Sequence, residues 1–528
     1  MTSKALAQYA VFVSAVAIII ASCLLSSNCD GSEEDCFVVD GIYYLILSDN
    51  AVEAYDFDKL LQEAIIPSHV VHDGISYAVV SLNSLYRTQP FEYVYIPDTV
   101  TSIEGFIDEL NRTNRIEISP LNPQYASRDD VIYSKNMTQL LLYPLTKTDS
   151  SFMIPEEVLS IHRYAFTSNK YLEEITIDGR IQLIENGAFQ DCSNLKWINR
   201  TSVGNTLPEG LLTIGTSAFL GTGLEDICLP DTLRMIGQDA FGFSSIKSLH
   251  IGSGITFIGE AAFCSCLELE SITSTSYYFH VEDDVLFKRD FETNQLILIT
   301  YPAGKKDTSY RIPEEVIGIA PLAFHGIAYL EEVIFPHSMS TVPTHSFFYA
   351  QSLKRIVLSD SILSVDYSAF YECSLEEIVW GANITSIGSS AFEWNCLVDL
   401  VLPDTIHTID DLAFARNFDL SHVFIPDGVR YMGNRVFADD TLIEDIEFGG
   451  SAPYMARNSL SISDDEFDLF VLHLTVQKGF VLPDRALDDH TALVLDIKGL
   501  LPYPYENLIV VLLCAIIVMF ILRFVKDV

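Results

Sequence analysis

Basic residues are scarce in this sequence, and the short motifs of enzyme chemistry are missing from it. Thirty-one Lys and Arg residues stand against 72 Asp and Glu residues, which gives a formal net charge of −41. A field of that sign repels phosphate-rich polymers, so we expect no nucleic-acid partner. The sequence contains no nucleophile elbow, no His-Glu-x-x-His pattern and no phosphate-cradling glycine loop. We therefore expect a protein that is not an enzyme, with no catalytic and no cofactor-binding residues.

Metal-ligand spacings are equally rare. Cys264-x-Cys266 lacks a second ligand pair, whereas a zinc site needs four ligands. Acidic pairs such as Glu376-Glu377 could hold Ca²⁺, but no EF-hand or Gly-Asp repeat spacing surrounds them. Solvated surface carboxylates are the favoured interpretation, so we expect no metal and no cofactor.

The acidic composition does not indicate a disordered polymer, because 49% of the residues are hydrophobic. A chain of 528 residues is too long for one compact core. Several domains or an elongated array are therefore expected.

Two long uncharged runs lie near the ends of the chain. Residues 1–29 contain the first, which is a signal peptide, a retained membrane anchor or, through Ile20-Ala21-Ser22-Cys23, a lipidated leader. Residues 507–525 contain the second, which has the length of a transmembrane helix if Arg523 reaches the interface. A buried C-terminal helix is the alternative. Basic residues outside both runs predict a cell-membrane protein with an extracellular acidic bulk and a cytoplasmic C-terminus.

A repeat of 22 or 23 residues fills the middle of the chain. Each copy has a turn, a Val, Leu or Ile, an Ile-Gly, an Ala-Phe and then Leu-x-x-Ile-x-Ile, as from Pro230 onward. The Phe positions are Phe166, Phe189, Phe219, Phe241, Phe263, Phe324, Phe347, Phe370, Phe392, Phe414 and Phe437. This period is typical of a solenoid, in which one coil cannot fold alone and stacked coils share a core.

Three local patterns modify the repeat. Asp40-Gly41 and Asp73-Gly74 are turn signals in a first β-rich unit. Asp129-Asp130 and Asp283-Asp284 each lead to a Tyr-Pro step, and the segments between look like hairpins inserted into the stack. After Ile103 the expected Ala-Phe is missing, as in the degenerate coils that cap such stacks.

Cysteine recurs at one place in the coil. Cys192, Cys266 and Cys373 each follow their repeat Phe by three residues, and Cys396 follows its own by four. Such a slot usually holds a small buried hydrophobe. Near the N-terminus, Cys29 and Cys36 flank an acidic linker and could form a disulfide outside the membrane.

The consensus Ile-Pro-x-x-Val-x-x-Ile-Gly-x-x-Ala-Phe-x-x-Cys-x-x-Leu resembles the BspA-type leucine-rich repeat of microbial surface proteins, over about residues 37–448. The resemblance implies a right-handed β-solenoid and a role in adhesion or host-surface interaction. It implies no catalytic residue. The departures at Ile103-Glu104-Gly105 and Val342-Pro343-Thr344-His345 affect local regularity only.

We therefore expect a mainly β protein with 22–23-residue coils and two hairpin-like insertions. Its expected segments are a signal peptide or N-terminal anchor (1–29), a β-rich capping unit with degenerate first repeats (37–110), the repeat solenoid (111–448), a C-terminal cap or juxtamembrane β unit (449–503) and a transmembrane helix (507–525).

Candidate binding residues lie on the outward face of the repeat strands. Stacked strands place equivalent residues in columns with a spacing of about 4.8 Å. The later coils show an apolar column of Ile334, Val357, Val379, Val401 and Phe424 beside a mainly acidic column that includes Glu332, Glu377 and Asp399. These columns are either cross-strand ladders that stabilise the sheet or a stripe that binds a partner.

Four Asn-x-Thr sequons, at Asn111, Asn136, Asn199 and Asn383, are candidate glycosylation sites. The favoured function is adhesion or recognition of a protein or glycan on another cell or matrix. A structural spacer or protective surface coat is the alternative, and an enzyme confined to residues 450–500 is the least favoured.

Overall fold

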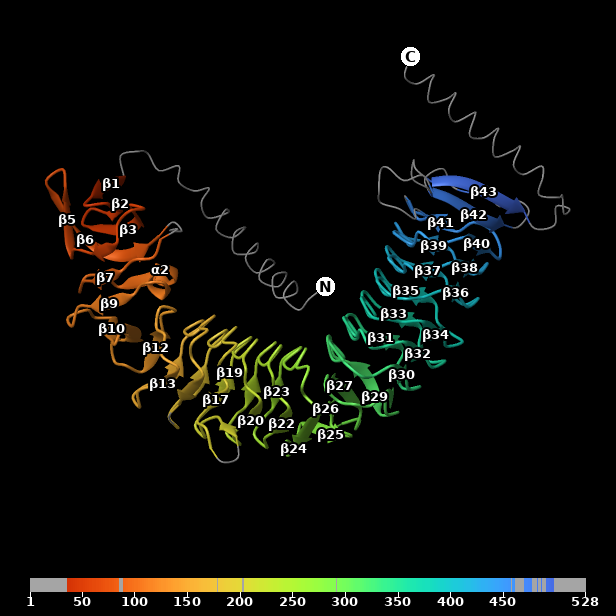
Figure 1. Cartoon of the computed structure of the whole chain (residues 1–528), viewed down its shortest axis with the longest axis horizontal. Helices are drawn as coiled ribbons and strands as arrows, with labels where there is room; N and C mark the ends of the chain where they lie inside the picture. The colour runs from red at the N-terminus through yellow and green to blue at the C-terminus, as the bar shows by residue number, and fades with distance from the viewer. Residues whose placement is uncertain are drawn as a thin grey trace, which may run out of the picture. The chain divides into compact units, whose positions relative to one another are not determined.

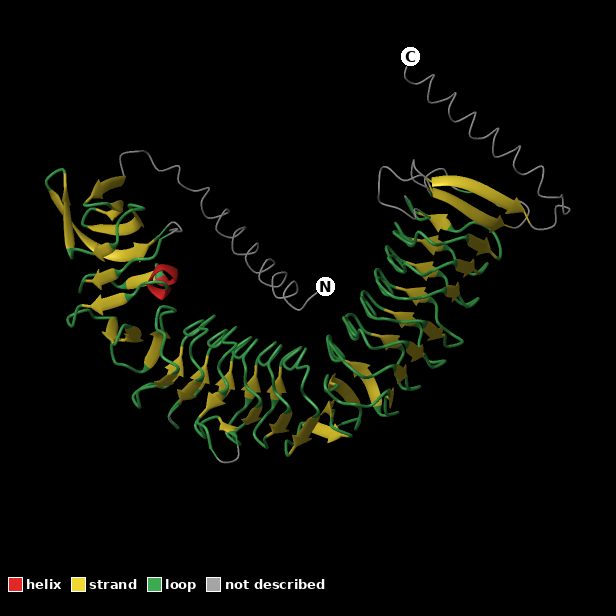
Figure 2. Cartoon of the chain, in the orientation of Figure 1, coloured by secondary structure: helices red, strands yellow, loops and turns green. Residues whose placement is uncertain are grey.

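The computed structural model describes residues 36–84, 89–177, 179–201, 204–290, 292–456, 458–460, 470–476, 482, 486 and 491–497. This part of the chain is built of strands and turns, with one short helix, α2 (Ile107–Asn111) (Figure 2). It divides into two compact units. The first extends to Phe241 and includes Phe257–Gly259, and the second contains Gly242–Thr256 and the chain from Glu260 onward.

A six-stranded sheet opens the first unit. Its strands are β1 (Cys36–Val39), β2 (Ile42–Ser48), β3 (Ala51–Phe57), β5 (His69–His72), β6 (Ile75–Asn83) and β8 (Ser102–Gly105). The order is β1-β2-β3-β6-β5, with β8 paired to β6. Asp40-Gly41 joins β1 to β2 and Asp73-Gly74 joins β5 to β6, and all four residues have positive φ. That conformation is typical of tight hairpin turns, so the two predicted Asp-Gly turns are confirmed.

The degenerate first coil has an aromatic residue that the sequence pattern missed. Phe106 is fully buried, and its ring centroid lies 5.0 Å from that of Phe57 and 5.8 Å from that of Phe91. It follows Ile103 by three residues instead of the usual five. Helix α2 begins directly after Phe106 and replaces the regular turn.

Ladders of short strands, most of them paired parallel, form the rest of the first unit (Figure 1). The strands are β4 (Glu63–Ile65), β7 (Tyr93–Ile96) and β9 (Arg115–Ile118) in one sheet; β10 (Tyr125–Arg128), β11 (Val131–Ser134), β12 (Gln139–Leu142), β14 (Ser160–Ile161), β16 (Leu183–Ile184), β19 (Thr213–Ile214), β21 (Met235–Ile236) and β23 (Phe257–Ile258) in the next; β13 (Ser151–Met153), β15 (Glu174–Thr176) and β17 (Trp197–Ile198); and β18 (Asn205–Thr206) with β20 (Asp226–Cys228).

The second unit repeats this plan, with two rows of strands side by side (Figure 1). Its strands are β22 (Ser248–Ile251) and β24 (Ser271–Ser274); β25 (Phe279–Glu282), β26 (Val285–Arg289), β27 (Leu296–Thr300) and β29 (Val316–Ile319); β28 (Ser309–Arg311), β30 (Glu332–Ile334), β32 (Arg355–Val357) and β34 (Glu377–Val379); β31 (Thr341–Val342), β33 (Ser364–Val365), β35 (Ser386–Ile387), β37 (Thr408–Ile409), β39 (Tyr431–Met432) and β41 (Tyr454–Met455); and β36 (Asp399–Val401), β38 (His422–Ile425), β40 (Asp445–Phe448), β42 (Phe470–Val476) and β43 (Thr491–Ile497). Strands β42 and β43 continue the parallel ladder from β40, so the C-terminal strands extend the stack.

Both predicted insertions are antiparallel meanders that join the ladder. In the first, β10, β11 and β12 pair antiparallel, and β12 then pairs parallel with β14. In the second, β25, β26 and β27 do the same before β27 pairs with β29. The Asp-Asp steps lie in the first turn of each meander, where all four residues have positive φ.

A stack of aromatic rings runs through the core of each unit. Neighbouring centroids lie 4.8 to 5.3 Å apart from Phe166 to Phe241 and 4.3 to 6.1 Å apart from Phe324 to Phe437. Tyr143 stacks on Phe166 at 5.0 Å and Tyr301 stacks on Phe324 at 5.2 Å. The tyrosine of each Tyr-Pro step therefore takes the place of the Phe where an insertion interrupts the repeat.

The backbone turns sharply on both sides of each Phe. The residue two positions before it and the residue two positions after it have positive φ, as Leu322 and Gly326 do around Phe324. Side chains other than glycine rarely adopt this conformation. The backbone at this corner is therefore strained, and the burial of the Phe side chain offsets that strain.

The slot three residues after each Phe is buried but often polar. The thiols of Cys192 and Cys373 donate to the Phe carbonyl of the preceding coil, at 3.0 and 3.1 Å. Burial raises the pKa of Cys192 to about 12, so its thiol keeps the proton that it donates. The expectation of a small buried hydrophobe is thus confirmed for Cys192, Cys266 and Cys373, whereas Cys396 is half-buried.

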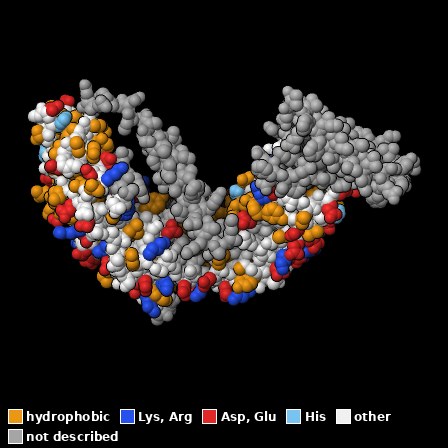
Figure 3. Space-filling view, turned by 45° about the horizontal axis from the view of Figure 1, so that its top comes forward, with side chains coloured by type: hydrophobic (Ala, Val, Ile, Leu, Met, Phe, Trp, Pro, Cys, Tyr) orange, Lys and Arg blue, Asp and Glu red, His pale blue; other side chains and the backbone are white. Residues whose placement is uncertain are grey.

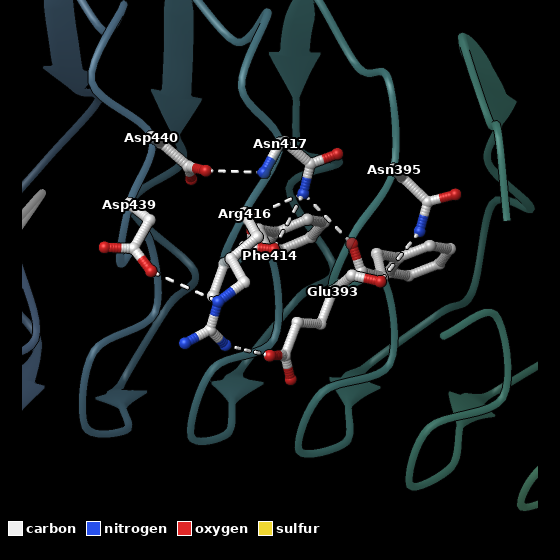
Figure 4. Close-up of polar contacts among 9 residues, drawn as sticks. Glu393, Asn395, Phe414, Arg416, Asn417, Asp439 and Asp440 are labelled. Carbon is white, nitrogen blue, oxygen red and sulfur yellow. Dashed lines mark hydrogen bonds and ion pairs between the residues drawn. The ribbon is translucent and has the colours of Figure 1, made fainter. Parts of the chain in front are cut away.

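Asparagine fills this slot in later coils and forms the equivalent hydrogen bond (Figure 4). The Nδ2 atoms of Asn395 and Asn417 donate to the carbonyls of Phe370 and Phe392, at 2.8 and 3.0 Å. In the Phe392 coil this slot holds Asn395 and not Cys396. The slot therefore bonds one coil to the one before it, because a buried carbonyl without a donor would be costly.

Candidate functional site

The predicted columns of the strand face lie in register in the second unit. Glu332 pairs with Arg355 and Arg355 with Glu377, and Ile334, Val357 and Val379 follow in the same order. Of the residues between them, Val333 and Ile356 are buried and Ile378 is half-buried. The alternation of a strand thus sends its two outer residues to the surface and its middle residue to the core.

Charged and hydroxyl groups form a continuous chain across four strands. Ser309 on β28 donates its hydroxyl to Glu332 Oε2 at 2.8 Å, and Arg355 forms an ion pair with Glu332 Oε1. Arg355 Nε also donates to Glu377 Oε2 at 2.8 Å. The hydroxyl of Ser309, followed by the Arg355 guanidinium, lowers the pKa of Glu332. The Glu332 carboxylate therefore stays ionised at neutral pH.

A second charged column lies directly beside the first. Lys354 Nζ lies 3.3 Å from Glu331 Oε1, and Glu376 follows on the next coil. Together the two columns line an open groove of about 370 Å³. Its lining residues are Thr308, Ser309, Glu331, Glu332, Lys354, Arg355, Glu376 and Glu377. Acidic and basic side chains lie side by side along the lower edge of this unit in Figure 3. Four carboxylates against two cations leave the groove acidic.

An apolar strip follows the groove along the same strands. Ile334, Val357 and Val379 occupy the last position of β30, β32 and β34 and are half-buried. These side chains stand next to Glu332, Arg355 and Glu377 on every coil. A partner that lies across the strands would meet an apolar strip and a charged groove together.

The predicted column continues into a separate sheet. Asp399, Val401 and Phe424 lie on β36 and β38, whose sheet does not include β34. There Val401 pairs with Phe424, and Val401 is 64% exposed. His422 Nδ1 lies 3.4 Å from Asp399 Oδ1. The sequence-predicted stripe is therefore two shorter patches, and its continuity could not be read from the repeat spacing.

A cluster of titratable groups at the Phe corner has a structural role (Figure 4). Arg416 pairs with Glu393 and, at 3.1 Å, with Asp439. Asp440 occupies the buried slot and accepts the backbone N–H of Asn417 at 2.6 Å. Burial raises the pKa of Asp440 well above its usual range. Within the part of the chain that the structure describes, its Oδ2 has no hydrogen-bond partner.

The remaining predicted residues are dispersed. Cys36 is exposed at the start of β1, and its predicted partner Cys29 lies outside the described residues. Asn111 ends α2, Asn136 lies in the β11–β12 turn, Asn199 follows β17 and Asn383 lies between β34 and β35. The sequence prediction omitted Ser309 and Lys354, although their place in the ladder register would have identified them.

The predicted anchors in residues 1–29 and 507–525 also lie outside the described residues. None of the helices among residues 36–497 that are described is long and apolar enough to cross a membrane. The same residues bring no three His, Cys, Asp or Glu side chains together in a group that could hold a metal ion.

The stacked coils and the outward strand face define a solenoid of leucine-rich repeats. The family described as BspA type Leucine rich repeat region matches residues 146–270, 201–304 and 317–444, in six copies. These matches span more than half of the chain. The chain belongs to the BspA-type leucine-rich repeat family.

Several solved structures are similar to this chain at low identity. A leucine rich cell surface protein from Faecalibacterium prausnitzii A2-165 is 23% identical, with 80% of this chain and 96% of that one covered and a TM-score of 0.44. The Pneumococcal vaccine antigen PcpA is 20% identical, with coverage of 88% and 98% and a TM-score of 0.47. A leucine-rich repeat protein from Bacteroides ovatus ATCC 8483 is 20% identical, with coverage of 87% and 99% and a TM-score of 0.40. No curated protein matches the chain.

Proposed function

We propose that this chain is a non-catalytic adhesion or recognition protein that binds its partner through the strand face of β28, β30, β32 and β34. The observation that supports this most is the open groove of about 370 Å³ with an apolar strip alongside it. Partly exposed apolar side chains that border charged groups suit a binding site. The flanking charges set register and exclude wrong partners.

The charge of the groove indicates the chemistry of the partner. Four glutamates outnumber Lys354 and Arg355, and the whole chain is strongly acidic. A partner segment that carries basic groups next to apolar ones fits this face, whether it belongs to a protein or to an amino-sugar glycan on another cell or matrix. Binding should then weaken as salt rises, because salt screens exposed charges beyond about 10 Å at 0.1 M.

One observation favours a structural spacer or protective coat as the second candidate. Arg355 is already held by Glu332 and Glu377, and Ser309 completes the chain of contacts. Groups satisfied in this way stabilise a sheet without any ligand. A spacer would tolerate substitution of the apolar strip with no loss beyond stability.

The location that we propose is the cell membrane, with an extracellular repeat and a cytoplasmic C-terminus. The uncharged runs in residues 1–29 and 507–525 support it, and the surface proteins among the solved relatives are consistent with it. Protease added to intact cells should remove the repeat and leave a short C-terminal fragment in the membrane. A chain that is digested only after lysis would contradict this topology.

The binding role is tested with the full-length chain on protein and glycan arrays. The double variant Val357→Lys with Val379→Lys should lose the ligands that the wild type binds while it keeps the same melting temperature. Thr176→Lys is the matched control, because Thr176 occupies the equivalent exposed position on β15 of the first unit. Absence of any ligand at low and high salt supports the spacer.

A further inference from the structure

We propose that Asn136 is an attachment site for an N-linked glycan. Asn136 is exposed in the turn between β11 and β12, and it begins the sequon Asn136-Met137-Thr138. This turn belongs to the first insertion and exposes Asn136 to solvent, so a large polar group attached there displaces no core residue. The other three sequons share the sequence pattern but not the geometry.

The side chain of Asn136 has a fixed orientation. Its Oδ1 accepts the Thr138 hydroxyl at 2.8 Å, the Thr138 backbone N–H at 3.2 Å and the Ser134 hydroxyl at 2.8 Å. A backbone N–H can only donate, so the atom that receives it is the amide oxygen. Among the described residues no hydrogen bond is made by Asn136 Nδ2, which leaves the reactive nitrogen available.

The sequon hydroxyl is committed elsewhere in the other three. Thr113 donates to Glu109 O at 2.7 Å, Thr201 to Gly204 O at 2.9 Å and Thr385 to Leu363 O at 3.0 Å. Thr138 is therefore the only one of the four described sequon threonines whose hydroxyl faces its own asparagine.

The amide nitrogens of two other sequons hold neighbouring coils together. Asn199 Nδ2 donates to Ile177 O at 2.8 Å, and its Oδ1 accepts Ile177 N–H at 2.7 Å. Asn383 Nδ2 donates to Asp360 O at 2.9 Å. A glycan on Asn199 would have to fit beside the Nδ2 atom that bonds Ile177 O. Asn111 is half-buried, and its Oδ1 accepts Leu145 N–H at 3.2 Å.

The hydroxyl contact also helps the reaction. Attachment forms a bond between Asn136 Nδ2 and the anomeric carbon of a glycan carried on a lipid pyrophosphate. The bond from that carbon to the pyrophosphate oxygen breaks, the lipid pyrophosphate leaves, and one Nδ2 proton passes to a base of the transferase. A hydrogen bond to the amide oxygen stabilises the charge that develops there as the proton leaves.

In the second insertion, the turn between β26 and β27 has an aspartate in a similar role, although its threonine follows by three residues and not two. There Asp290 Oδ1 accepts the Thr293 hydroxyl and the Thr293 N–H, both at 3.0 Å, and the Glu292 N–H at 2.9 Å. These bonds lower the pKa of Asp290, so it acts as a carboxylate acceptor. Asn136→Asp should therefore keep the turn and remove only the nitrogen that is modified.

The test is translation of the full-length chain behind a cleavable secretory leader, in the presence of endoplasmic-reticulum microsomes. Leader cleavage reports translocation, and an N-glycan amidase with peptide mapping locates any glycan. We expect one glycan, at Asn136, which N136D and Thr138→Val lose and Thr138→Ser keeps. A translocated chain without a glycan on Asn136, or with occupancy at Asn199 equal to that at Asn136, would overturn the proposal.

Discussion

Replacing Asn417 by Ala tests the polar slot that joins the coils. The Asn417 side chain is fully buried, and its Nδ2 donates to Phe392 O at 3.0 Å while its Oδ1 accepts Leu397 N–H at 3.4 Å. The substitution leaves a buried carbonyl and a buried N–H without these partners. Each such group costs about 1–3 kcal/mol. We expect the free energy of unfolding of the second unit to fall by about 2–6 kcal/mol.

Urea unfolding followed by circular dichroism measures the loss, and hydrogen exchange with mass spectrometry locates it. Exchange protection should fall in the Phe392 and Phe414 coils first, because repeats depend mainly on their neighbours. Asn383→Ala is the matched control, since Asn383 Nδ2 also bonds the preceding coil but from an exposed position. Its cost should stay below about 1 kcal/mol. Equal costs for the two variants would refute the reasoning. The slot would then need no polar side chain, as in the Phe347 coil, where it holds Ala350.

Three further predictions concern burial and strain. Asp440→Asn should raise the melting temperature at pH 7 and raise it much less at pH 4. Burial raises the Asp440 pKa, so the folded chain holds a proton that the unfolded chain releases above about pH 4, and wild-type stability therefore falls as pH rises. A gain in melting temperature that does not grow with pH would contradict this. Burial lowers the pKa of His325 to about 4, so its side chain is neutral in the folded chain and takes up a proton in the unfolded chain below about pH 6.5. The free energy of unfolding of the wild type should therefore fall by up to about 3 kcal/mol between pH 6.5 and pH 4, and that of His325→Gln should not. Parallel acid-melting curves for the two chains would contradict this. Leu322→Gly should raise the melting temperature because Leu322 has a φ of 59°, and the free energy of unfolding should rise by up to about 1 kcal/mol. Ile317→Gly on β29 should lower the melting temperature. A lower melting temperature for both variants would exclude strain at Leu322.

The repeat, its inward residues and its outward columns could be predicted because each depends on spacing along one coil. Val357 lies outward because it stands one position after the buried Ile356. The same alternation places Glu332 and Glu377 on the surface. Their register follows once the coil length is known.

Features that depend on two coils at once could not be predicted from one period. Tyr143 completes the aromatic stack only because β12 pairs with β14 across the insertion. The polar slot could not be recognised from the sequence, because Cys and Asn look unrelated there. Only the structure shows that each donates to the Phe carbonyl of its preceding coil. The groove could not be predicted from the column residues alone, because its lining also includes Lys354, which precedes the column residue Arg355.

Hydrogen-exchange footprinting of the full-length chain with and without its array-selected ligand tests the central claim most directly. The account predicts that exchange slows in peptides that contain β28, β30, β32 and β34, with no change in those that contain β13, β15 and β17. The slowing should disappear in the double variant Val357→Lys with Val379→Lys. Protection confined to any other part of the chain would contradict a binding role for this strand face.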